Sequence, residues 1–428
     1  MNAFQWLTGI ENSHIGELGV DELAMTSHYG RVVEDIELAA STGAEGIRYG
    51  APWAVLEPGR DRFDWTISDI ALHAMEESGL DPVWDLVHFG APSWLKGGFL
   101  DPDYPDAIAA FASAFATRYS YVRRYTPFNE PYICAFFRGG NGTWPPYGCG
   151  ARSFVRLLTP ILEGIRRTIA AIRTARPGAE IWLNDGADGY RPGNAVLAPL
   201  AAELESLRFM PLDLLLGKAV PGNPTREYME NAGANAKWLD RCAGDPAPID
   251  VIGIDYYPGS EHLIAPPADE RDSGDWGRRG DYSILPDPNP LGIGRIMAMY
   301  NERYGLPVYL AETSSGCAQR EWLDYCLSEM ALARSLGVNL VGMTWWPLFD
   351  HVDWDSGLTN LRGHICPSGL WHGRPRASDR KEGDTVATFR ATVAAGDPKV
   401  LPDANLGLPF PCAAFESGNV VFDRKESR

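Results

Sequence analysis

The chain has 428 residues, of which 45% are apolar, and it carries a formal net charge of −18. The apolar fraction is normal for a globular protein with a well-buried core. The strong negative charge repels phosphate backbones and anionic lipid surfaces, so we expect neither nucleic acid nor a membrane as a partner. No apolar run approaches the ~20 residues that a membrane-spanning helix needs.

The sequence has seven cysteines, which are scattered singly and form no Cys-x-x-Cys pair. An odd number of isolated cysteines fits reduced thiols better than a disulfide framework. The first residues, Met1 to Trp6, lack a basic stretch followed by an apolar run and so show no signal peptide. We therefore expect a cytoplasmic protein.

Eight short apolar stretches alternate with amphipathic stretches from the N-terminus onward. The predicted strands are 4–10, 46–49, 82–88, 125–129, 180–184, 249–257, 307–312 and 340–346. The predicted helices are 28–42, 66–78, 106–124, 153–176, 193–205, 292–304, 319–336 and 380–395. Strands that alternate with helices predict parallel βαβ units. Eight such units predict a closed (β/α)8 barrel, or TIM barrel, whose chemistry lies at the C-terminal ends of the strands.

A doubly wound open sheet is the competing fold, but its one weak match to a phosphate-binding glycine motif follows no predicted strand. The segments 258–290 and 347–378 have little periodicity and predict long loops after strands six and eight. We expect the first loop to form part of the cleft wall. We also expect one α/β barrel domain over residues 1–396, followed by a C-terminal tail over 397–428 that packs on the barrel or trails from it.

Two glutamates stand at the ends of predicted strands. Glu130 closes the fourth strand and Glu312 closes the seventh. A carboxylate at the end of a buried strand is costly unless it is paired or takes part in chemistry. Glycoside hydrolysis uses two carboxyl groups, one on each side of the bond that breaks. The two glutamates are therefore candidate catalytic residues, and structural ion pairs at the barrel rim are the alternative.

Four motifs follow one another in the order and at the spacing of a known enzyme family. They are His-Phe-Gly-Ala-Pro-Ser-Trp-Leu at 88–95, Thr-Pro-Phe-Asn-Glu-Pro at 126–131, Leu-Ala-Glu-Thr-Ser-Ser-Gly at 310–316 and Trp-Pro-Leu-Phe-Asp-His-Val-Asp-Trp at 346–354. Over roughly residues 1–395 the chain resembles glycoside hydrolase family 1. The resemblance implies a retaining β-glycosidase with a covalent glycosyl-enzyme intermediate, in which Glu130 is the acid/base and Glu312 the nucleophile.

The resemblance also implies a supporting set of residues. Asn129 is expected at the sugar 2-hydroxyl, His88 at another sugar hydroxyl and Trp346 beneath the sugar ring, whereas Trp345 faces the opposite way and packs. Arg48 lies in an otherwise apolar strand, and a buried guanidinium needs an anionic partner. Glu312 is the implied partner, because a nearby cation keeps a nucleophile ionised; a salt bridge at the barrel floor is the alternative.

Predicted strand six carries two further polar side chains. Period-two alternation puts Asp255 and Tyr257 on the same face. The family pattern implies that Tyr257 lies beside Glu312. Asp255 stands where the family has Asn, and its carboxyl either raises the pKa of a neighbour or pairs with Arg48.

The family's two residues for the outer sugar hydroxyls are not kept. Glu11 or His14 occupies the region of the family's Gln, and ungapped matching favours His14. Asp353 stands in place of the family's Glu, one methylene shorter, and is followed by Trp354 as a further candidate substrate contact. These changes alter hydroxyl recognition and leave the sugar open, and the loop lacks the residues of the 6-phospho-sugar branch.

We expect a small-molecule glycoside or oligosaccharide as substrate, no cofactor and no metal, and we make no prediction of the oligomeric state. Three other functions compete with hydrolysis. A transglycosidase would use the same intermediate with a non-water acceptor on an aromatic surface of Trp94, Trp144 and Trp354. A catalytically silent glycan-binding barrel has no reason to hold both glutamates. A metal-dependent barrel hydrolase lacks any recognised ligand spacing, although it could draw on His88, His351, His364 and His372.

Overall fold

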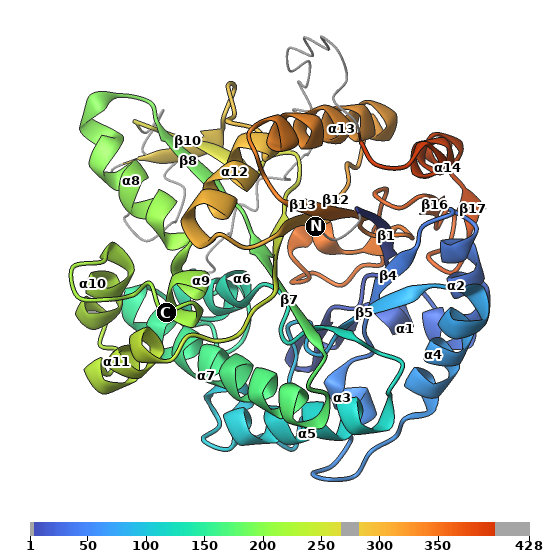
Figure 1. Ribbon diagram of the computed structural model, residues 1–428, viewed down its shortest axis with the longest axis horizontal. Helices are drawn as coiled ribbons and strands as arrows, with labels where there is room; N and C mark the ends of the chain where they lie inside the picture. The colour runs from blue at the N-terminus through green and yellow to red at the C-terminus, as the bar shows by residue number, and fades with distance from the viewer. Residues whose placement is uncertain (1–3, 267–281, 399–428) are drawn as a thin grey trace.

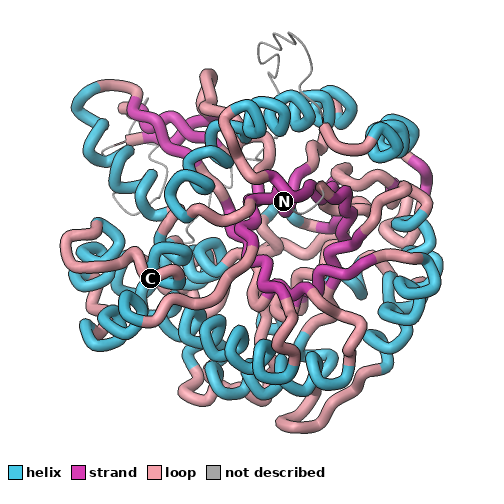
Figure 2. Tube along the Cα trace, in the orientation of Figure 1, coloured by secondary structure: helices cyan, strands magenta, loops and turns pink. Residues whose placement is uncertain are grey.

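The computed structural model describes residues 4–266 and 282–398. Eight parallel strands close into a barrel, which appears as the central ring in Figure 2. In the order in which they pair, they are β1 (Gln5–Gly9), β13 (Leu340–Trp345), β12 (Val308–Thr313), β9 (Val251–Asp255), β7 (Glu180–Gly186), β6 (Arg124–Thr126), β5 (Asp81–Asp85) and β4 (Gly46–Tyr49), which returns to β1. The predicted (β/α)8 barrel is confirmed.

The barrel strands are apolar on both faces. Every residue of β12 and β13 is buried, as expected for parallel strands covered by helices outside and filled by side chains inside. A small apolar cluster draws all its members from barrel strands, in positions that alternate with those of the main core, so it fills the interior. Its members are Leu7, Val83, Trp182, Val251, Tyr309, Ala311 and Val341.

Helices surround this ring (Figures 1 and 2). Those that match the predicted helices are α2 (Val32–Ala40), α4 (Thr66–Ser78), α5 (Tyr104–Arg118), α7 (Ala151–Ala175), α8 (Ala198–Leu207), α12 (Ile293–Tyr304), α13 (Gln319–Ser335) and α14 (Thr385–Ala395). Further helices are α1 (Glu22–Met25), α3 (Trp53–Leu56), α6 (Pro131–Ala135), α9 (Met210–Leu215), α10 (Pro224–Asn231) and α11 (Ala236–Gly244). The last three lengthen the connection between β7 and β9, which the sequence analysis treated as a single helical unit.

Short strands lie outside the barrel, and three of them change the predicted picture of segment 258–290. β10 (Glu261–Ala265) pairs parallel with β8 (Gly189–Pro192) and antiparallel with β11 (Ser283–Pro286), and Figure 1 shows β8 and β10 beside α8 and α12. The predicted long loop after strand six thus contains two short strands, which the sequence did not predict because their pairing partner β8 is remote in sequence. Residues 267–281 lie outside the described part of the chain.

The other short elements belong to the loops at the barrel mouth and rim. The strands are β2 (His14–Ile15), β3 (Val20–Asp21), β14 (His351–Val352), β15 (Ile365–Cys366), β16 (Trp371–His372) and β17 (Lys381–Glu382). The short helical turns are η1 (Gly16–Leu18), η2 (His28–Gly30), η3 (Gly98–Leu100), η4 (Phe136–Gly140), η5 (Ala195–Leu197) and η6 (Trp354–Ser356). The predicted long loop after strand eight thus contains β14, η6, β15 and β16.

Four whole-chain predictions have different outcomes. Five cysteines are free but Cys317 is disulfide-bonded, so the prediction of reduced thiols is wrong at Cys317. Cysteines that are far apart in the sequence can meet only through the fold, and the predicted cytoplasmic location stays a prediction. Within the described ranges, no helix combines the length and hydrophobicity that crossing a bilayer demands. The tail from residue 399 onward lies outside the described residues, so the predicted domain boundary stays a prediction.

The packing inside the barrel predicts a stability difference between two glycines. A Cβ at Gly253 in β9 would lie 2.5 Å from Asn184 Cβ and 2.7 Å from Tyr309 Cε1, whereas a Cβ at Gly244 in α11 meets nothing within 4 Å. We expect Gly253→Ala to destabilise the protein by about 1–3 kcal/mol through overpacking. Gly244→Ala should be neutral or stabilising, since alanine favours helix. Urea unfolding midpoints measure both, and equal midpoints would contradict this packing.

Candidate active site

Glu130 stands in a sharp turn after β6. Asn129 N donates to Val87 O at 2.8 Å, which holds the turn against the segment that follows β5. Glu130 itself has φ 45° and ψ 64°, a left-handed conformation, and precedes Pro131 at the start of α6. Non-glycine residues in this conformation are strained and cluster at functional sites. The turn carries the predicted acid/base out of the strand and into the mouth of the barrel.

Glu312 lies near the C-terminal end of β12. The register of β12 against β9 shifts between Leu310 and Glu312, and such irregularities re-aim side chains at barrel rims. Glu312 Oε1 pairs with Arg48 Nη1, and Tyr257 OH donates to Glu312 Oε2 at 2.8 Å. The structure therefore brings together Arg48, Tyr257 and Glu312 as the sequence analysis predicted.

One hydrogen-bond network joins Arg48 to the predicted sugar-binding residues. Arg48 Nη2 donates to Asp85 Oδ2 at 2.9 Å and to Asn129 Oδ1 at 2.6 Å. Asn184 Nδ2 donates to the same Asn129 oxygen at 2.7 Å. His88 Nδ1 lies 2.8 Å from Asp85 Oδ2, and Asn129 Nδ2 lies 2.9 Å from His88 Nε2. These contacts orient the Asn129 amide on both of its ends.

The same contacts assign the tautomer of His88. Its Nδ1–H donates to the Asp85 carboxylate, so Nε2 accepts from the Asn129 amide. In this arrangement His88 Nε2 does not donate to a sugar. The predicted hydroxyl contact therefore requires a substrate that displaces the Asn129 amide from His88.

Asp255 is a third carboxyl group beside the two glutamates. It lies opposite Glu312 across the β9–β12 pair, and its Oδ2 accepts from Asn184 Nδ2 at 2.5 Å. Burial raises its pKa well above the usual range, the charge of Glu312 raises it further, and Arg48 opposes both effects. Asp255 therefore contacts Asn184 and does not pair directly with Arg48. Of the two roles that the sequence left open, the structure favours the one in which its carboxyl raises the pKa of a neighbour.

The two glutamates have different electrostatic surroundings. Burial raises the pKa of Glu130 well above its ordinary value, and the negative charges of Asp255, Glu312 and Asp185 raise it further. Burial also raises the pKa of Glu312, but the guanidinium of Arg48 and the ring of His88 act in the opposite direction. A glutamate among carboxylates is the better proton holder, and a glutamate held by a guanidinium is the better anion.

Trp346 lies beside His88 and Arg48. Its ring stacks on His88, with centroids 5.6 Å apart and planes within 3°, and Arg48 Cζ lies 4.6 Å from the ring centroid. The residue is only 1% exposed, so protein groups cover most of the predicted sugar platform. Trp345 packs outward against Phe389, as predicted.

The structure distinguishes between Glu11 and His14. Glu11 Oε2 accepts from Trp346 Nε1 at 3.0 Å, and Glu11 Oε1 lies 3.8 Å from His88 Nε2. Burial works against the charged form, but His88, His351 and the Ser13 N–H outweigh it and lower the pKa of Glu11. The ring of His14 lies against Gly90, where a Cβ would come within 2.7 Å of its Nδ1. Glu11, and not the His14 that ungapped matching favours, therefore joins the pocket cluster.

Asp353 has a structural role that the sequence analysis did not predict. It is fully buried, its Oδ1 accepts from His364 N at 2.7 Å, and its Oδ2 accepts from Arg362 N and Gly363 N at 2.9 and 3.0 Å. Both carboxylate oxygens are thus bound to the backbone of their own loop. The prediction that Asp353 binds sugar hydroxyls is corrected, since the shorter side chain folds back onto the loop.

Trp354 lies beside the aromatic side chains of the barrel mouth. It is half-buried, and its ring centroid lies 6.2 Å from that of Phe89 and 6.4 Å from that of Trp144.

The four histidines of the metal-dependent alternative do not converge. His88 contacts Asp85, His372 contacts Asp350 at 3.2 Å, and His364 lies in a separate cluster with Asp355 and Cys366.

Three polar residues near the two glutamates were not predicted from the sequence. They are Asp85 at the end of β5, and Asn184 and Asp185 near the end of β7. Asp185 accepts from Tyr132 N and Gly186 N, both at 3.0 Å, and burial raises its pKa to about 8. A polar residue at the C-terminal end of an apolar barrel strand is the signal that identified Glu130 and Glu312, and it would also have found these three.

Comparison with known proteins places the chain in a family. A model of glycosyl hydrolase family 1 matches residues 8–198. Beta-glucosidase 4 of Oryza sativa subsp. japonica is 32% identical over 434 aligned positions, which cover 85% of this chain and 84% of that protein. The chain belongs to glycosyl hydrolase family 1. As a family 1 chain it is a β-glycosidase, an O-glycoside hydrolase, which confirms the predicted class of enzyme.

Other family 1 proteins extend the comparison. Coniferin beta-glucosidase of Pinus contorta is 25% identical and is matched over 82% of this chain and 78% of its own length. A similar relative, at 22% identity, is named as a probable inactive beta-glucosidase of Oryza sativa subsp. japonica. The family 1 β-glucosidase of Thermotoga maritima superposes with a TM-score of 0.77 at 17% identity, over 94% of this chain and 99% of that one, which confirms the fold.

The three backbone contacts of Asp353 predict a local stability effect. Asp353→Ala removes three charge-assisted hydrogen bonds, each worth about 1.5–3 kcal/mol. We expect amide hydrogen exchange at Arg362, Gly363 and His364 to accelerate at least about ten-fold, which corresponds to about 1.4 kcal/mol of local stability. Exchange detected by mass spectrometry measures this change. Glu382→Ala, in the exposed strand β17, is the control, and unchanged exchange in Asp353→Ala would contradict the assigned role.

Proposed function

We propose that this chain is a retaining β-glycosidase in which Glu130 is the acid/base and Glu312 is the nucleophile. The observation that carries the proposal is the contrast between the two side chains. Glu312 contacts the guanidinium of Arg48 and the hydroxyl of Tyr257, whereas carboxylates surround Glu130. Retaining enzymes need one carboxylate and one carboxylic acid in the same pocket at the start of the reaction.

In the first step a carboxylate oxygen of Glu312 attacks the anomeric carbon. The bond from that carbon to the leaving oxygen breaks, and Glu130 transfers its proton to that oxygen. The products are a glycosyl ester on Glu312, the free aglycone and an ionised Glu130. Arg48 and Tyr257 hold the attacking carboxylate in place.

In the second step a water molecule replaces the aglycone. Esterification has removed the charge of Glu312, which is one of the charges that raises the pKa of Glu130. Glu130 therefore remains ionised. It takes a proton from the water molecule while the water oxygen attacks the anomeric carbon and displaces Glu312. The sugar leaves with its original configuration, and both glutamates return to their starting states.

The residues around the glutamates support binding of the sugar. The Asn129 amide is oriented by Arg48, Asn184 and His88, so it can exchange the contact with His88 for a sugar hydroxyl. Glu11 carries a lowered pKa and faces Trp346, which makes it an anionic acceptor for hydroxyl groups. We assign hydroxyl recognition to Glu11 in the role that the family gives to Gln.

The substrate that we propose is a small β-linked glycoside or oligosaccharide. The names of the relatives point to β-glucosides, and the Thermotoga maritima enzyme has been seen with castanospermine and with deoxynojirimycin. The carboxylates Glu11 and Glu312 repel anionic groups, which disfavours phosphorylated or acidic sugars at this site. A panel of nitrophenyl β-glycosides, including glucoside, galactoside, fucoside, xyloside and mannoside, identifies the sugar.

The structure weakens the aromatic acceptor surface that favoured transglycosylation. Trp144 is 0% exposed and its Nε1 donates to Gly357 O at 2.8 Å, so its ring is closed to an acceptor. Trp94 Nε1 donates to Glu57 O at 2.9 Å, and Arg60 lies over the ring. Trp94 and Trp354 are both half-buried, but only Trp354 has neither its indole N–H bonded to a backbone oxygen nor a guanidinium over its ring, so the acceptor surface is reduced and hydrolysis is the function we propose.

The proposed roles of the two glutamates predict different mutant behaviour. Glu312→Ala should abolish turnover of nitrophenyl glycosides, and added azide should restore it and yield the glycosyl azide of inverted configuration. Glu130→Ala should slow substrates with poor leaving groups by about 10²–10⁴-fold and leave activated substrates much less affected, because only poor leaving groups need the proton. Steady-state kinetics and product NMR measure both effects.

Glu321→Ala, in the first turn of α13, is the matched control and should keep native kinetics. Near-native turnover in Glu312→Ala would contradict the assignment of the nucleophile. If neither the unmodified protein nor any variant turned over a glycoside, but the protein bound one saturably, the glycan-binding alternative would be supported. Product distributions with and without an added alcohol separate hydrolysis from glycosyl transfer.

The carboxyl group of Asp255 predicts a change in pH dependence. Glu130 must be protonated for the first step, so activity falls as the pH rises through the pKa of Glu130. The charge of Asp255 raises that pKa. Asp255→Asn should therefore move the alkaline limb of the kcat/KM profile toward lower pH. Asp250→Asn, just before the N-terminal end of the same strand, should leave the limb in place, and an unmoved limb in Asp255→Asn would refute the assigned influence.

A further inference from the structure

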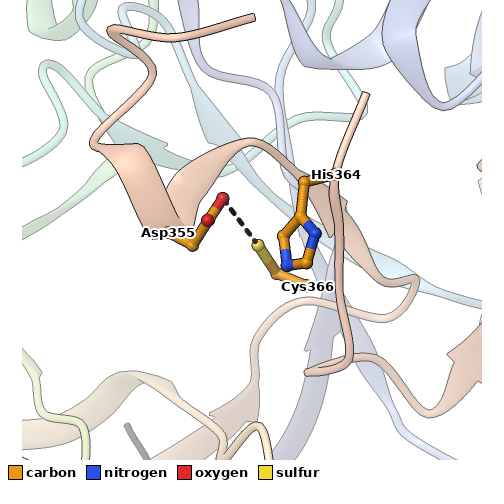
Figure 3. Close-up of side chains that lie close together, drawn as sticks. All are labelled: Asp355, His364 and Cys366. Carbon is orange, nitrogen blue, oxygen red and sulfur yellow. Dashed lines mark hydrogen bonds between the residues drawn. The ribbon is translucent and has the colours of Figure 1, made fainter. Parts of the chain in front are cut away.

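The loop after β13 brings three potential metal ligands together away from the glutamates. Asp355 comes from η6, Cys366 from β15 and His364 from the turn between them, and Figure 3 shows their side chains converging. One ligand atom from each residue lies within 4.8 Å of the other two. We propose that Asp355, His364 and Cys366 bind a thiophilic divalent cation of the Zn²⁺ class.

The donor set suits this class of ion. Thiolate sulfur, imidazole nitrogen and carboxylate oxygen are the usual ligands of zinc, at about 2.3, 2.0 and 2.0–2.2 Å. Ligand atoms at these distances from a tetrahedral ion lie roughly 3.5 Å from one another. Asp355 Oδ1 and Cys366 Sγ are already 3.8 Å apart. Binding therefore needs small side-chain rotations and leaves the fourth position to water.

The backbone around the three ligands is held by independent contacts. The carboxylate of Asp353 accepts from the amides of residues 362–364, and Asp353 N donates to His364 O at 2.8 Å. The antiparallel pairing of His351 with Cys366 and of Val352 with Ile365 fixes β15 against β14. Asp353 immediately precedes η6, and Asp355 lies two residues after it within that turn. The contacts of Asp353 therefore hold the backbone on both sides of Asp355 and His364, and the strand pair positions Cys366.

The charges at the cluster also fit a divalent cation. On binding, the thiol of Cys366 releases its proton to solvent, so the thiolate offsets one positive charge of the ion and the Asp355 carboxylate is shared between the ion and Arg362. Asp355 Oδ2 pairs with Arg362 Nη2, while Oδ1 faces the sulfur. The ion pair thus orients the carboxylate and leaves one oxygen for the metal.

The cluster is open to ions from solution and connected to the barrel mouth. His364 is exposed, Asp355 is half-buried, and Cys366 is buried. The turn η6 begins with Trp354, whose ring lies beside Phe89 and Trp144. A bound cation would stiffen the loop that carries Trp354 without entering the catalytic pocket, so the proposal does not depend on the glycosidase mechanism.

Titration of the whole metal-free chain with Co²⁺ in oxygen-free buffer tests the proposal. Co²⁺ takes the same ligands as Zn²⁺ and gives a thiolate-to-metal charge-transfer absorption. We expect one Co²⁺ per chain with this absorption and its displacement by Zn²⁺. Cys366→Ser should remove the absorption, and His364→Gln and Asp355→Asn should each weaken binding at least ten-fold.

Two variants control for non-specific binding. Cys149→Ser removes an exposed free thiol, and His73→Gln removes an exposed histidine on α4, and both should leave the titration unchanged. Absence of the thiolate absorption at saturating Co²⁺ would overturn the proposal, as would its persistence in Cys366→Ser. Because Cys366 is buried and its variant could misfold, the exposed His364 gives a second criterion, and unchanged affinity in His364→Gln would also overturn the site.

Discussion

The ion pair between Arg48 and Glu312 is the interaction on which the organisation of the barrel mouth depends. Both side chains are almost fully buried, and removing one partner of a buried pair typically costs about 3–5 kcal/mol, because the other charge is left uncompensated. The same guanidinium also binds Asp85 and Asn129. Through these contacts one cation from β4 sets the positions of Asp85 at the end of β5, Asn129 after β6 and Glu312 in β12, so these groups are oriented by the protein's own contacts.

The charge balance of the pocket explains why its carboxyl groups differ. Burial raises the pKa of Glu130, Asp255 and Asp185, and Arg48 is the guanidinium that acts against burial at Glu312 and Asp255. A buried site with more carboxyl groups than cations lowers its energy by keeping protons on some of them. The groups farther from Arg48 keep those protons more readily. The proposed division of labour between acid and nucleophile follows from the position of this one side chain.

The loop after β13 shows how a small sequence change can alter the role of a position. A glutamate at position 353 would be one methylene longer, whereas Asp353 binds the amides of residues 362–364. In the proposed function Glu11, which follows β1 and contacts Trp346 directly, takes over hydroxyl recognition. The clamp formed by Asp353 also orders the backbone that carries Asp355 and His364. The same backbone contacts of Asp353 therefore occupy its carboxylate and order the loop that carries the proposed cation ligands.

The sequence by itself determined the eight barrel strands, most of the helices around them and the placement of Glu130 and Glu312 at strand ends, because hydrophobic periodicity and strand ends are local properties. The family resemblance, and not the periodicity, pointed to Arg48 and Tyr257 beside Glu312. Only the tertiary structure decided matters that depend on contacts between remote residues. These include the pairing of β10 with β8, the disulfide at Cys317, the inward position of Glu11 in preference to His14, and the backbone clamp of Asp353. In each case the local sequence allows several interaction partners for a residue, and the folded chain brings only one of them within contact distance.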